Sequence, residues 1–352
     1  MKKILSVIGA RPQFIKHAPL SAALRKKFES LSIHTGQHYD ENMSRVFFDE
    51  LKMDRPDFLL DLGKATTHGA QTGVMLQQIE EILVREKPDA VLVYGDTNST
   101  IAGSLAAAKL GIPIIHIEAG LRSYNREMPE EINRVVTDHL SQLLFAPTTV
   151  AIDNLAKEGI TQGVFLTGDV MCDSLNMMKP FLEHKQDGRY YFVTLHRPYN
   201  TDNQERLTSV LNVLNGLDLP VVFPIHPRTS GLLARWGVDL STFGNIRFVD
   251  PVGYKDCLSY QSGADCVITD SGGIQKEAYM LHRQCITIRK ETEWVETLEG
   301  GCNTLVFDNL AQIPELLQRR GTLTFKDLYG DGHAADEIVS IIDANLSQAT
   351  RP

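Results

Sequence analysis

The sequence has 352 residues, of which 43% are hydrophobic and 22% are charged, which is typical of a globular protein with room for two apolar cores. Its formal net charge of −9 argues against a nucleic-acid-binding surface. We therefore expect two domains and a small-molecule partner, with no nucleic acid.

No segment predicts export or a membrane span. The first apolar run, residues 4–8, ends at Gly9, and no run reaches the roughly 18 apolar residues of a membrane helix. We therefore expect a cytoplasmic protein that does not bind membranes. The five cysteines lack a C-x-x-C pair, which predicts buried thiols with neither a disulfide framework nor a zinc site, and we expect no metal: Cys172, Cys257, Cys266, Cys285 and Cys302.

Short Val/Ile-rich runs alternate with amphipathic stretches through the first half of the chain. Strands are expected at residues 4–8, 32–34, 90–94, 114–117 and 143–145. Helices are expected at residues 12–27, 69–86, 99–109 and 129–141, two of them with proline in the first turn. Unbroken apolar strands that alternate with helices indicate a parallel sheet covered on both faces.

The pattern restarts after Thr167-Gly168-Asp169. Strands are expected at residues 191–195, 221–225, 246–249, 266–269 and 284–288, each followed by a helix, and a last helix at residues 334–346. The predicted fold is α/β, with two doubly wound Rossmann-like domains facing a central cleft. The first domain would span residues 1–168, with residues 333–352 packing back on it, and the second would span residues 169–332.

Ionisable residues follow the strands of the first half. Arg11 and Lys16 lie where the first strand leads into a helix, and both could meet a phosphate or be ordinary surface charges. Asp96 follows the strand at 90–94 as a helix cap or an active-site carboxylate. Glu118 directly follows an apolar strand, where a carboxylate needs a partner, and Arg122 is a candidate. A helix start at Glu130 adds further carboxylates, which the helix dipole explains in part.

The second half adds histidines and an anion site. His196 and His226 each end a strand with an arginine nearby. The Asp-Ser-Gly-Gly turn at residues 270–273 leads a strand into a helix, and two glycines with free N–H groups suit a phosphate. On its own this turn is an ordinary strand-to-helix connection. A G-x-G-x-x-G fingerprint is missing, which disfavours a dinucleotide cofactor.

Seven of these segments, in the same order along almost the whole chain, resemble motifs of the non-hydrolysing UDP-N-acetylglucosamine 2-epimerase family. They are G-A-R-P at residues 9–12 with Lys16, G-D-T at 95–97, H-I-E-A-G-L-R at 116–122, P-E-E-I-N-R at 129–134, His196-Arg197, T-D-S-G-G at 269–273 with Glu277, and Y-G-D-G at 329–332. The resemblance implies a homodimer with two domains of glycosyltransferase-B type that inverts C2 of UDP-N-acetylglucosamine without NAD or any other cofactor. It also implies elimination of UDP to a 2-acetamidoglucal, followed by re-addition.

The resemblance also implies roles for individual residues. Asp96, Glu118 and Glu130 become acid-base candidates, with His196 as a further catalytic or phosphate-contacting group. The substrate-binding set comprises the nucleotide-phosphate contacts Arg11, Lys16, His226, Ser271, Gly272 and Gly273, the ribose ligand Glu277, and the supporting residues Glu131 and Arg134.

Two departures from the family pattern affect substrate choice. Pro198-Tyr199-Asn200 follows His196-Arg197 where an acidic residue and Asn or Ser are common, and Trp294 stands where T-E-R-P-E has arginine. They leave open a UDP-2,3-diacetamido-2,3-dideoxy-glucuronate 2-epimerase. Because fold does not fix function, a hydrolysing epimerase that releases UDP, a glycosyltransferase on the same scaffold and a non-catalytic UDP-sugar sensor also stay open.

Overall fold

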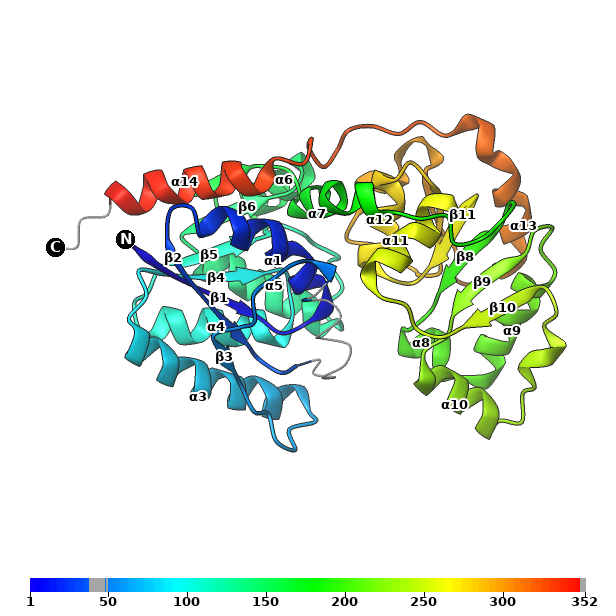
Figure 1. Ribbon diagram of the computed structural model, residues 1–352, viewed down its shortest axis with the longest axis horizontal. Helices are drawn as coiled ribbons and strands as arrows, with labels where there is room; N and C mark the ends of the chain where they lie inside the picture. The colour runs from blue at the N-terminus through cyan, green and yellow to red at the C-terminus, as the bar shows by residue number, and fades with distance from the viewer. Residues whose placement is uncertain (38–47, 49, 349–352) are drawn as a thin grey trace. The chain divides into compact units, whose positions relative to one another are not determined.

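The chain forms two units, each built on its own sheet, and the computed structural model describes residues 1–37, 48 and 50–348. Unit 1 comprises Met1–Met177 and Leu328–Pro352, and unit 2 comprises Met178–Asp327 (Figure 1). In the described residues, no helix is both long enough and apolar enough to span a membrane.

The sheet of unit 1 is parallel throughout, with the strand order β3-β2-β1-β4-β5-β6-β7. All residues of β4, β5 and β6 are buried, as expected for parallel strands with helices on both faces. The sequence did not predict β3 or β7. The strands are β1 (Lys3–Ile8), β2 (Glu29–His34), β3 (Phe58–Leu59), β4 (Ala90–Tyr94), β5 (Ile114–Ile117), β6 (Leu143–Ala146) and β7 (Val164–Leu166).

Helices cover both faces of this sheet (Figure 1). On one face, Leu20 and Leu24 of α1 share an apolar core with Ile338 and Ile342 of α14. On the other face, the buried side of α3 packs with the small residues of α4, for example Met75 with Ala102. The helices are α1 (Arg11–Leu24), α3 (His68–Glu86), α4 (Asn98–Lys109), α5 (Pro129–Leu140), α6 (Thr149–Lys157), α7 (Val170–Met178) and α14 (Ala334–Gln348).

Helix α7 belongs with unit 1, whereas the sequence placed the domain boundaries at 168/169 and 332/333. The Oγ of Ser174 donates to the carbonyl of Ile15 in α1 at 2.7 Å. The carboxylate of Asp173 accepts from the backbone N–H groups of Ala334 and Ala335, at 3.2 and 2.9 Å, and so caps the start of α14. These contacts fix α7 and α14 to each other and to α1.

Unit 2 repeats the architecture, with a parallel sheet in the order β10-β9-β8-β11-β12-β13. Leu211 of α9 and Leu233 of α10 pack on one face, and Cys257 of α11 and Ala278 of α12 pack on the other. The elements are β8 (Tyr191–Thr194), α8 (Pro198–Thr201), α9 (Gln204–Asn215), β9 (Val221–Pro224), α10 (Pro227–Arg235), β10 (Ile246–Val249), α11 (Tyr254–Gly263), β11 (Cys266–Thr269), α12 (Gly272–Met280), β12 (Gln284–Thr287), β13 (Asn303–Leu305) and α13 (Ile313–Leu316).

Two features of unit 2 differ from the sequence prediction. The strand β12 is followed by a kinked 3-10 segment, Val295–Gly301, with non-helical backbone at Glu299 and Gly300, and not by an α-helix. The strand β13, three residues long, was not predicted. The predicted fold class, two doubly wound Rossmann-like domains, is confirmed by the two strand orders. In each sheet the chain first adds strands on one side of its first strand and then crosses to the other side.

The Asp173 cap yields a stability prediction. Asp173→Ala should lower the free energy of unfolding by about 1–3 kcal/mol, because the start of α14 loses its acceptor and buried N–H groups are left unpaired. Urea unfolding followed by circular dichroism measures the change. Asp343→Asn, which breaks only the exposed pair with Lys27, is the control and should stay within about 0.5 kcal/mol. Equal effects of the two changes would show that α14 does not depend on its cap.

Candidate active site

The strand order places the candidate residues at the reversal point of each sheet. In unit 1 the order turns between β1 and β4, and Arg11 follows β1 while Asp96 follows β4. In unit 2 it turns between β8 and β11, and His196 and Ser271 follow those strands. Ligands of doubly wound sheets bind beyond the carboxyl ends of the strands at this point.

Glu118 and Lys16 form a buried ion pair through Oε2 and Nζ, with both side chains 8% exposed. Lys16 comes from the second turn of α1, and Glu118 follows β5. The expectation that Arg122 would pair with Glu118 is wrong. Arg122 binds the carboxylates of Asp138 and Glu158 instead, at 2.7 Å from each.

The backbone of Glu118 is strained, because its φ of 69° lies in the left-handed region that non-glycine residues avoid. Such a conformation costs about 1–3 kcal/mol and persists only where the surroundings fix it, as they do at functional sites. The carbonyl of Phe145 accepts from the N–H groups of both Glu118 and Ala119, at 3.1 and 3.0 Å. Asn154 donates to the carbonyl of Gly120 at 3.1 Å, so the turn is held along its length.

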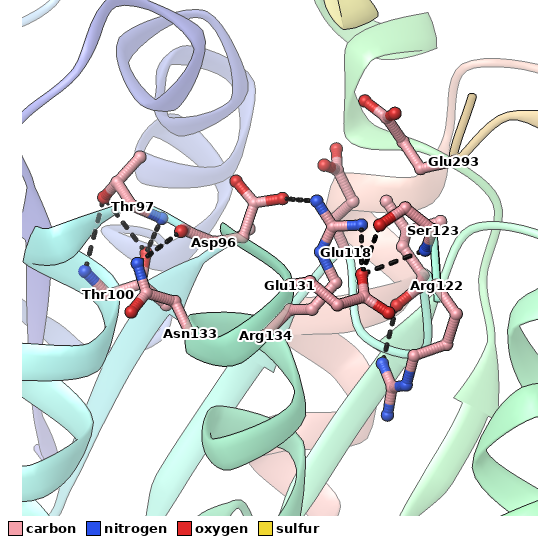
Figure 2. Close-up of polar contacts among 12 residues, drawn as sticks. Asp96, Thr97, Thr100, Glu118, Arg122, Ser123, Glu131, Asn133, Arg134 and Glu293 are labelled. Atoms are coloured by element: carbon pink, nitrogen blue, oxygen red, sulfur yellow. Dashed lines mark hydrogen bonds and ion pairs between the residues drawn. The ribbon is translucent and has the colours of Figure 1, made fainter. Parts of the chain in front are cut away.

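Arg134 joins two carboxylates (Figure 2). Its Nη2 contacts Oδ2 of Asp96, and its Nη1 donates to Oε2 of Glu131 at 3.1 Å. Asn133 donates from the same helix, α5, to the carbonyl of Asp96 at 2.9 Å. Helix α5 therefore fixes both the backbone and the side chain of Asp96.

Glu131 is buried and shapes the loop before α5. Its Oε2 accepts from the N–H and the hydroxyl of Ser123, both at 2.9 Å, and its Oε1 accepts from the N–H of Tyr124 at 2.8 Å. The supporting role of Glu131 in substrate binding stays a prediction. Arg11, the first residue of α1, and Glu130, near the start of α5, are both half-buried.

The sequence interpretation did not single out Gln13, which links the first turns of α1 and α4. Its Oε1 accepts from the N–H groups of Gly9 and Ala10 at 2.8 and 3.0 Å. Its Nε2 donates to the carbonyl of Tyr94 and to Thr97, at 2.9 and 3.0 Å. Its place between Arg11 and Lys16 is the only sequence signal that points to it.

Four more side chains, to which the sequence interpretation assigned no catalytic or binding role, form a hydrogen-bonded chain next to the turns that carry Asp96 and Glu118. It runs from His116 through Asp138 and Arg122 to Glu158. Burial disfavours ionisation of Asp138, but His116 and Arg122 outweigh it and hold the pKa of Asp138 below its ordinary value. Burial likewise opposes the charge on Arg122, yet Glu158 and Asp138 raise its pKa. The hydrogen bond from Arg122 lowers the pKa of Glu158.

Asp270 organises the turn after β8 in unit 2. It is fully buried and accepts from the backbone N–H groups of His196 and Arg197, both at 3.0 Å, and from the side chain of Asn200 at 3.0 Å. The ring of His196 also lies on it, with Nδ1 3.0 Å from Oδ1. Burial opposes ionisation of Asp270, but His196 and the other donors hold its pKa below the ordinary value.

The anion cradle begins one residue later. Ser271 is the N-cap of α12, and its hydroxyl accepts from the N–H of Ile274 at 3.4 Å. A side chain at Gly272 would collide with the carboxylate of Glu293, which pairs with the buried Arg289 at 2.9 Å. A buried cation thus lies beside the helix start at which the sequence predicted phosphate contacts.

The other predicted nucleotide ligands of unit 2 differ in exposure. Glu277, in α12, is buried, and its Oε2 accepts from Nε2 of Gln261 at 2.7 Å. His226 is exposed and caps α10, with Nδ1 accepting from the N–H of Arg228 at 3.2 Å. Gly273 lies in the first turn of α12.

Both departures from the family pattern have a structural role. Asn200 donates to the carbonyl of Ile288 at 3.0 Å as well as to Asp270, and it joins the turn after β8 to the end of β12. Trp294 is buried, and the ammonium of Lys276 lies 3.8 Å from the centre of its ring. This contact is a cation–π interaction between α12 and the loop after β12.

The low pKa of Asp270 yields a prediction about pH. Its ionised form should stabilise the native state fully above the ordinary pKa of 3.8, and this contribution should be lost as pH falls through the lower native value. Asp270→Asn should therefore be less stable than wild type by about 2–4 kcal/mol at pH 6.5, and the difference should be smaller at pH 3, where the unfolded carboxylate is mostly protonated. Urea midpoints at both values measure it. A difference that does not change with pH would contradict the ionised role of Asp270.

Comparisons with known proteins agree with this geometry. A family model described as UDP-N-acetylglucosamine 2-epimerase matches residues 22–343. The chain is 46% identical to a UDP-N-acetylglucosamine 2-epimerase homolog of Methanococcus maripaludis and to a UDP-2,3-diacetamido-2,3-dideoxy-D-glucuronate 2-epimerase of Pseudomonas aeruginosa, covering 97% of this chain and 99% of each relative.

A solved structure supports the same assignment. The crystal structure of Methanocaldococcus jannaschii UDP-GlcNAc 2-epimerase in complex with UDP-GlcNAc and UDP matches with a TM-score of 0.89 and 41% identity, over 97% of this chain and 99% of that one. The two Rossmann-like domains are thus of the glycosyltransferase-B type. The chain belongs to the UDP-N-acetylglucosamine 2-epimerase family and is an epimerase.

Proposed function

We propose that the protein is a non-hydrolysing epimerase that converts UDP-GlcNAc to UDP-ManNAc by inverting C2 of the sugar. The observation that carries this proposal is the pair of carboxylates at the carboxyl ends of β4 and β5, each beside a cation. Asp96 contacts Arg134, and Glu118 contacts Lys16 from a strained backbone position. Family membership supplies the reaction class.

The reaction we propose is an elimination followed by a re-addition. A carboxylate removes the C2 proton while the C1–oxygen bond breaks, its electron pair leaves with UDP, and a C1–C2 double bond forms in 2-acetamidoglucal. UDP then adds back to C1, and C2 is protonated on the opposite face. Proton donors and acceptors are therefore needed on both faces, which Asp96, Glu118 and Glu130 would provide, with His196 as a further group.

In this proposal, most of the nucleotide contacts lie in unit 2. Ser271, Gly272 and Gly273 donate to the diphosphate from the start of α12, with His226, and Glu277 accepts from the ribose hydroxyls. Arg11 and Lys16 are the phosphate contacts proposed in unit 1. Because the C2 proton is only weakly acidic, much of the lowering of the activation free energy must come from stabilising the departing diphosphate. The structural relative that binds UDP-GlcNAc and UDP supports this assignment of the ligand.

We also infer a homodimer from the family resemblance, which light scattering on the purified protein would test.

A second candidate substrate is UDP-2,3-diacetamido-2,3-dideoxy-glucuronate. The Pseudomonas aeruginosa relative named for this sugar is 46% identical to the chain, the same identity as the Methanococcus maripaludis relative and more than the 41% of the UDP-GlcNAc enzyme of the solved structure. Ratios of kcat/KM for the two UDP-sugars decide between them. Free UDP formed in step with sugar release, detected by anion-exchange chromatography, would instead show a hydrolysing epimerase.

Variants at the two carboxylates test the proposed roles. Asp96→Asn and Glu118→Gln should each lower kcat by more than about 10²-fold, because an acid-base group is lost, while binding of UDP measured by calorimetry should persist. Glu127→Gln, which changes an exposed carboxylate in the loop before α5, is the charge-matched control and should retain wild-type kcat.

Solvent isotope labelling adds an independent check. Wild type in D₂O should introduce one deuterium at C2 without any acceptor present, as mass spectrometry of the UDP-sugar pool would show. Near-normal kcat values for Asp96→Asn and Glu118→Gln would contradict the acid-base roles of these two carboxylates. A wild-type enzyme that needed an acceptor and incorporated no deuterium would point to glycosyl transfer.

A further inference from the structure

The turn that carries Asp96 and the turn that carries Glu118 are joined by two buried side chains. His116, on β5, has Nε2 2.8 Å from the carbonyl of Gly95 and Nδ1 2.7 Å from Oδ1 of Asp138. The second oxygen of Asp138 accepts from the N–H of Gly120 at 3.1 Å and from Arg122 at 2.7 Å. Asp138 is thus linked through His116 to Gly95, the residue before Asp96. It is linked directly to Gly120, in the turn that carries Glu118.

We propose that Asp138 is a positioning residue for the epimerase reaction, which sets the place of Asp96 relative to Glu118 through His116 and Gly120. This inference rests on the proposed acid-base roles of Asp96 and Glu118. Asp138 lies in α5, whose first two turns also carry Asn133 and Arg134, the residues that bind the backbone and side chain of Asp96. The same helix therefore fixes both turns.

The turn that carries Glu118 has a backbone conformation that requires such support. Glycine accommodates the φ values of 58° and 83° at Gly95 and Gly120, whereas Glu118 is strained at 69°. A side chain at Gly120 would collide with the backbone carbonyl of Ala151, so this turn cannot move outward freely. A strained turn stays in place only where its polar groups are bound. Asp138 supplies that bond for Gly120, and His116 supplies it for Gly95.

Neither Asp138 nor His116 is placed to react with substrate. Both side chains are fully buried, and both nitrogens of the His116 ring already contact protein oxygens. The oxygens of Asp138 are likewise occupied by His116, Gly120 and Arg122. Their effect on the reaction must therefore pass through the turns. A misplacement of reacting groups by about 1 Å can cost roughly 10²-fold in rate.

Asp138→Asn is the primary test, because it keeps the shape of the side chain and replaces one oxygen with a donor. The amide oxygen can still accept from Gly120 and Arg122, but the amide N–H group then faces Nδ1 of His116, which can accept it only as a neutral ring, and the negative charge between His116 and Arg122 is lost. With UDP-GlcNAc as substrate, we expect kcat per folded molecule to fall by about 10- to 100-fold while KM changes by less than about threefold. A kcat within twofold of wild type would overturn the proposal, as would a loss confined to KM.

Asp173→Asn is the matched control for a general loss of stability. Asp173 is also a buried carboxylate of unit 1 that accepts two backbone N–H groups, but it caps α14. This change should lower the urea midpoint and leave kcat per folded molecule unchanged. If it lowered kcat as much as Asp138→Asn, the effect of Asp138 would be merely structural and the proposal would fail.

A second variant keeps the test open if Asp138→Asn does not fold. His116→Gln should lower kcat by itself, and the double variant, if folded, should lose no more than the larger single effect, because both residues act in one linkage. Single effects that multiply would show that the two residues act separately. If neither Asp138→Asn nor the double variant folds, a kcat for His116→Gln within twofold of wild type would overturn the proposal.

Hydrogen exchange separates this inference from the proposed function. Mass spectrometry of peptides covering residues 94–100 and 116–123 should show faster exchange in both segments for His116→Gln and Asp138→Asn, and not for Asp173→Asn. Unchanged exchange would overturn the linkage. If wild type did not epimerise UDP-sugars but both segments still loosened together, the proposed function would fail and the structural linkage would stand.

Discussion

The structure depends on one constraint, which is that a carboxylate at the end of a buried parallel strand must be matched by donors. Glu118 is matched by Lys16, and Asp96 by Arg134. Without these partners, the free-energy cost of removing the carboxylate from water would destabilise the turn that carries it. The cations that match the carboxylates come from helices next to each strand end, so helix packing decides the electrostatics of the site.

The two units meet this constraint differently. Unit 1 uses a series of ionisable side chains, from His116 to Glu158, with the carboxylate of Asp138 bound between His116 and Arg122. In unit 2, backbone N–H groups, the amide of Asn200 and one half-exposed histidine hold Asp270. The first arrangement holds two turns at fixed separation, and the second shapes a single turn. This difference matches proposed roles in proton transfer for unit 1 and nucleotide binding for unit 2.

Most of the fold could be predicted because buried parallel strands are continuous apolar runs. The segments of β4 and β5 were predicted residue for residue, and β8 and β12 to within one residue. The strands β3, β7 and β13 were missed because two or three residues carry no periodic signal. The candidate site residues could be proposed because strand ends and motifs mark them, and their roles stay predictions. Their partners were not, since Lys16 meets Glu118 only through tertiary packing.

Asp138 and Asp270 also show that tertiary hydrogen-bond partners cannot be predicted from the sequence. Each is a buried aspartate whose importance comes from what it accepts, and nothing in the adjacent sequence shows which N–H groups will face it. The error over Arg122 has this cause too. Arg122 lies four positions after Glu118, but the intervening turn is not helical, so that spacing does not bring the two side chains together.

The return of α14 to unit 1 has a consequence for biosynthesis. Residues from Ala334 onward complete the apolar layer that α1 begins, so this layer stays open until α14 has left the ribosome. Unit 2 is one continuous segment whose last residue, Asp327, is made earlier. Domains generally fold as units during synthesis. Unit 2 can therefore fold on the nascent chain while unit 1, whose first segment is translated earlier, still waits for α14.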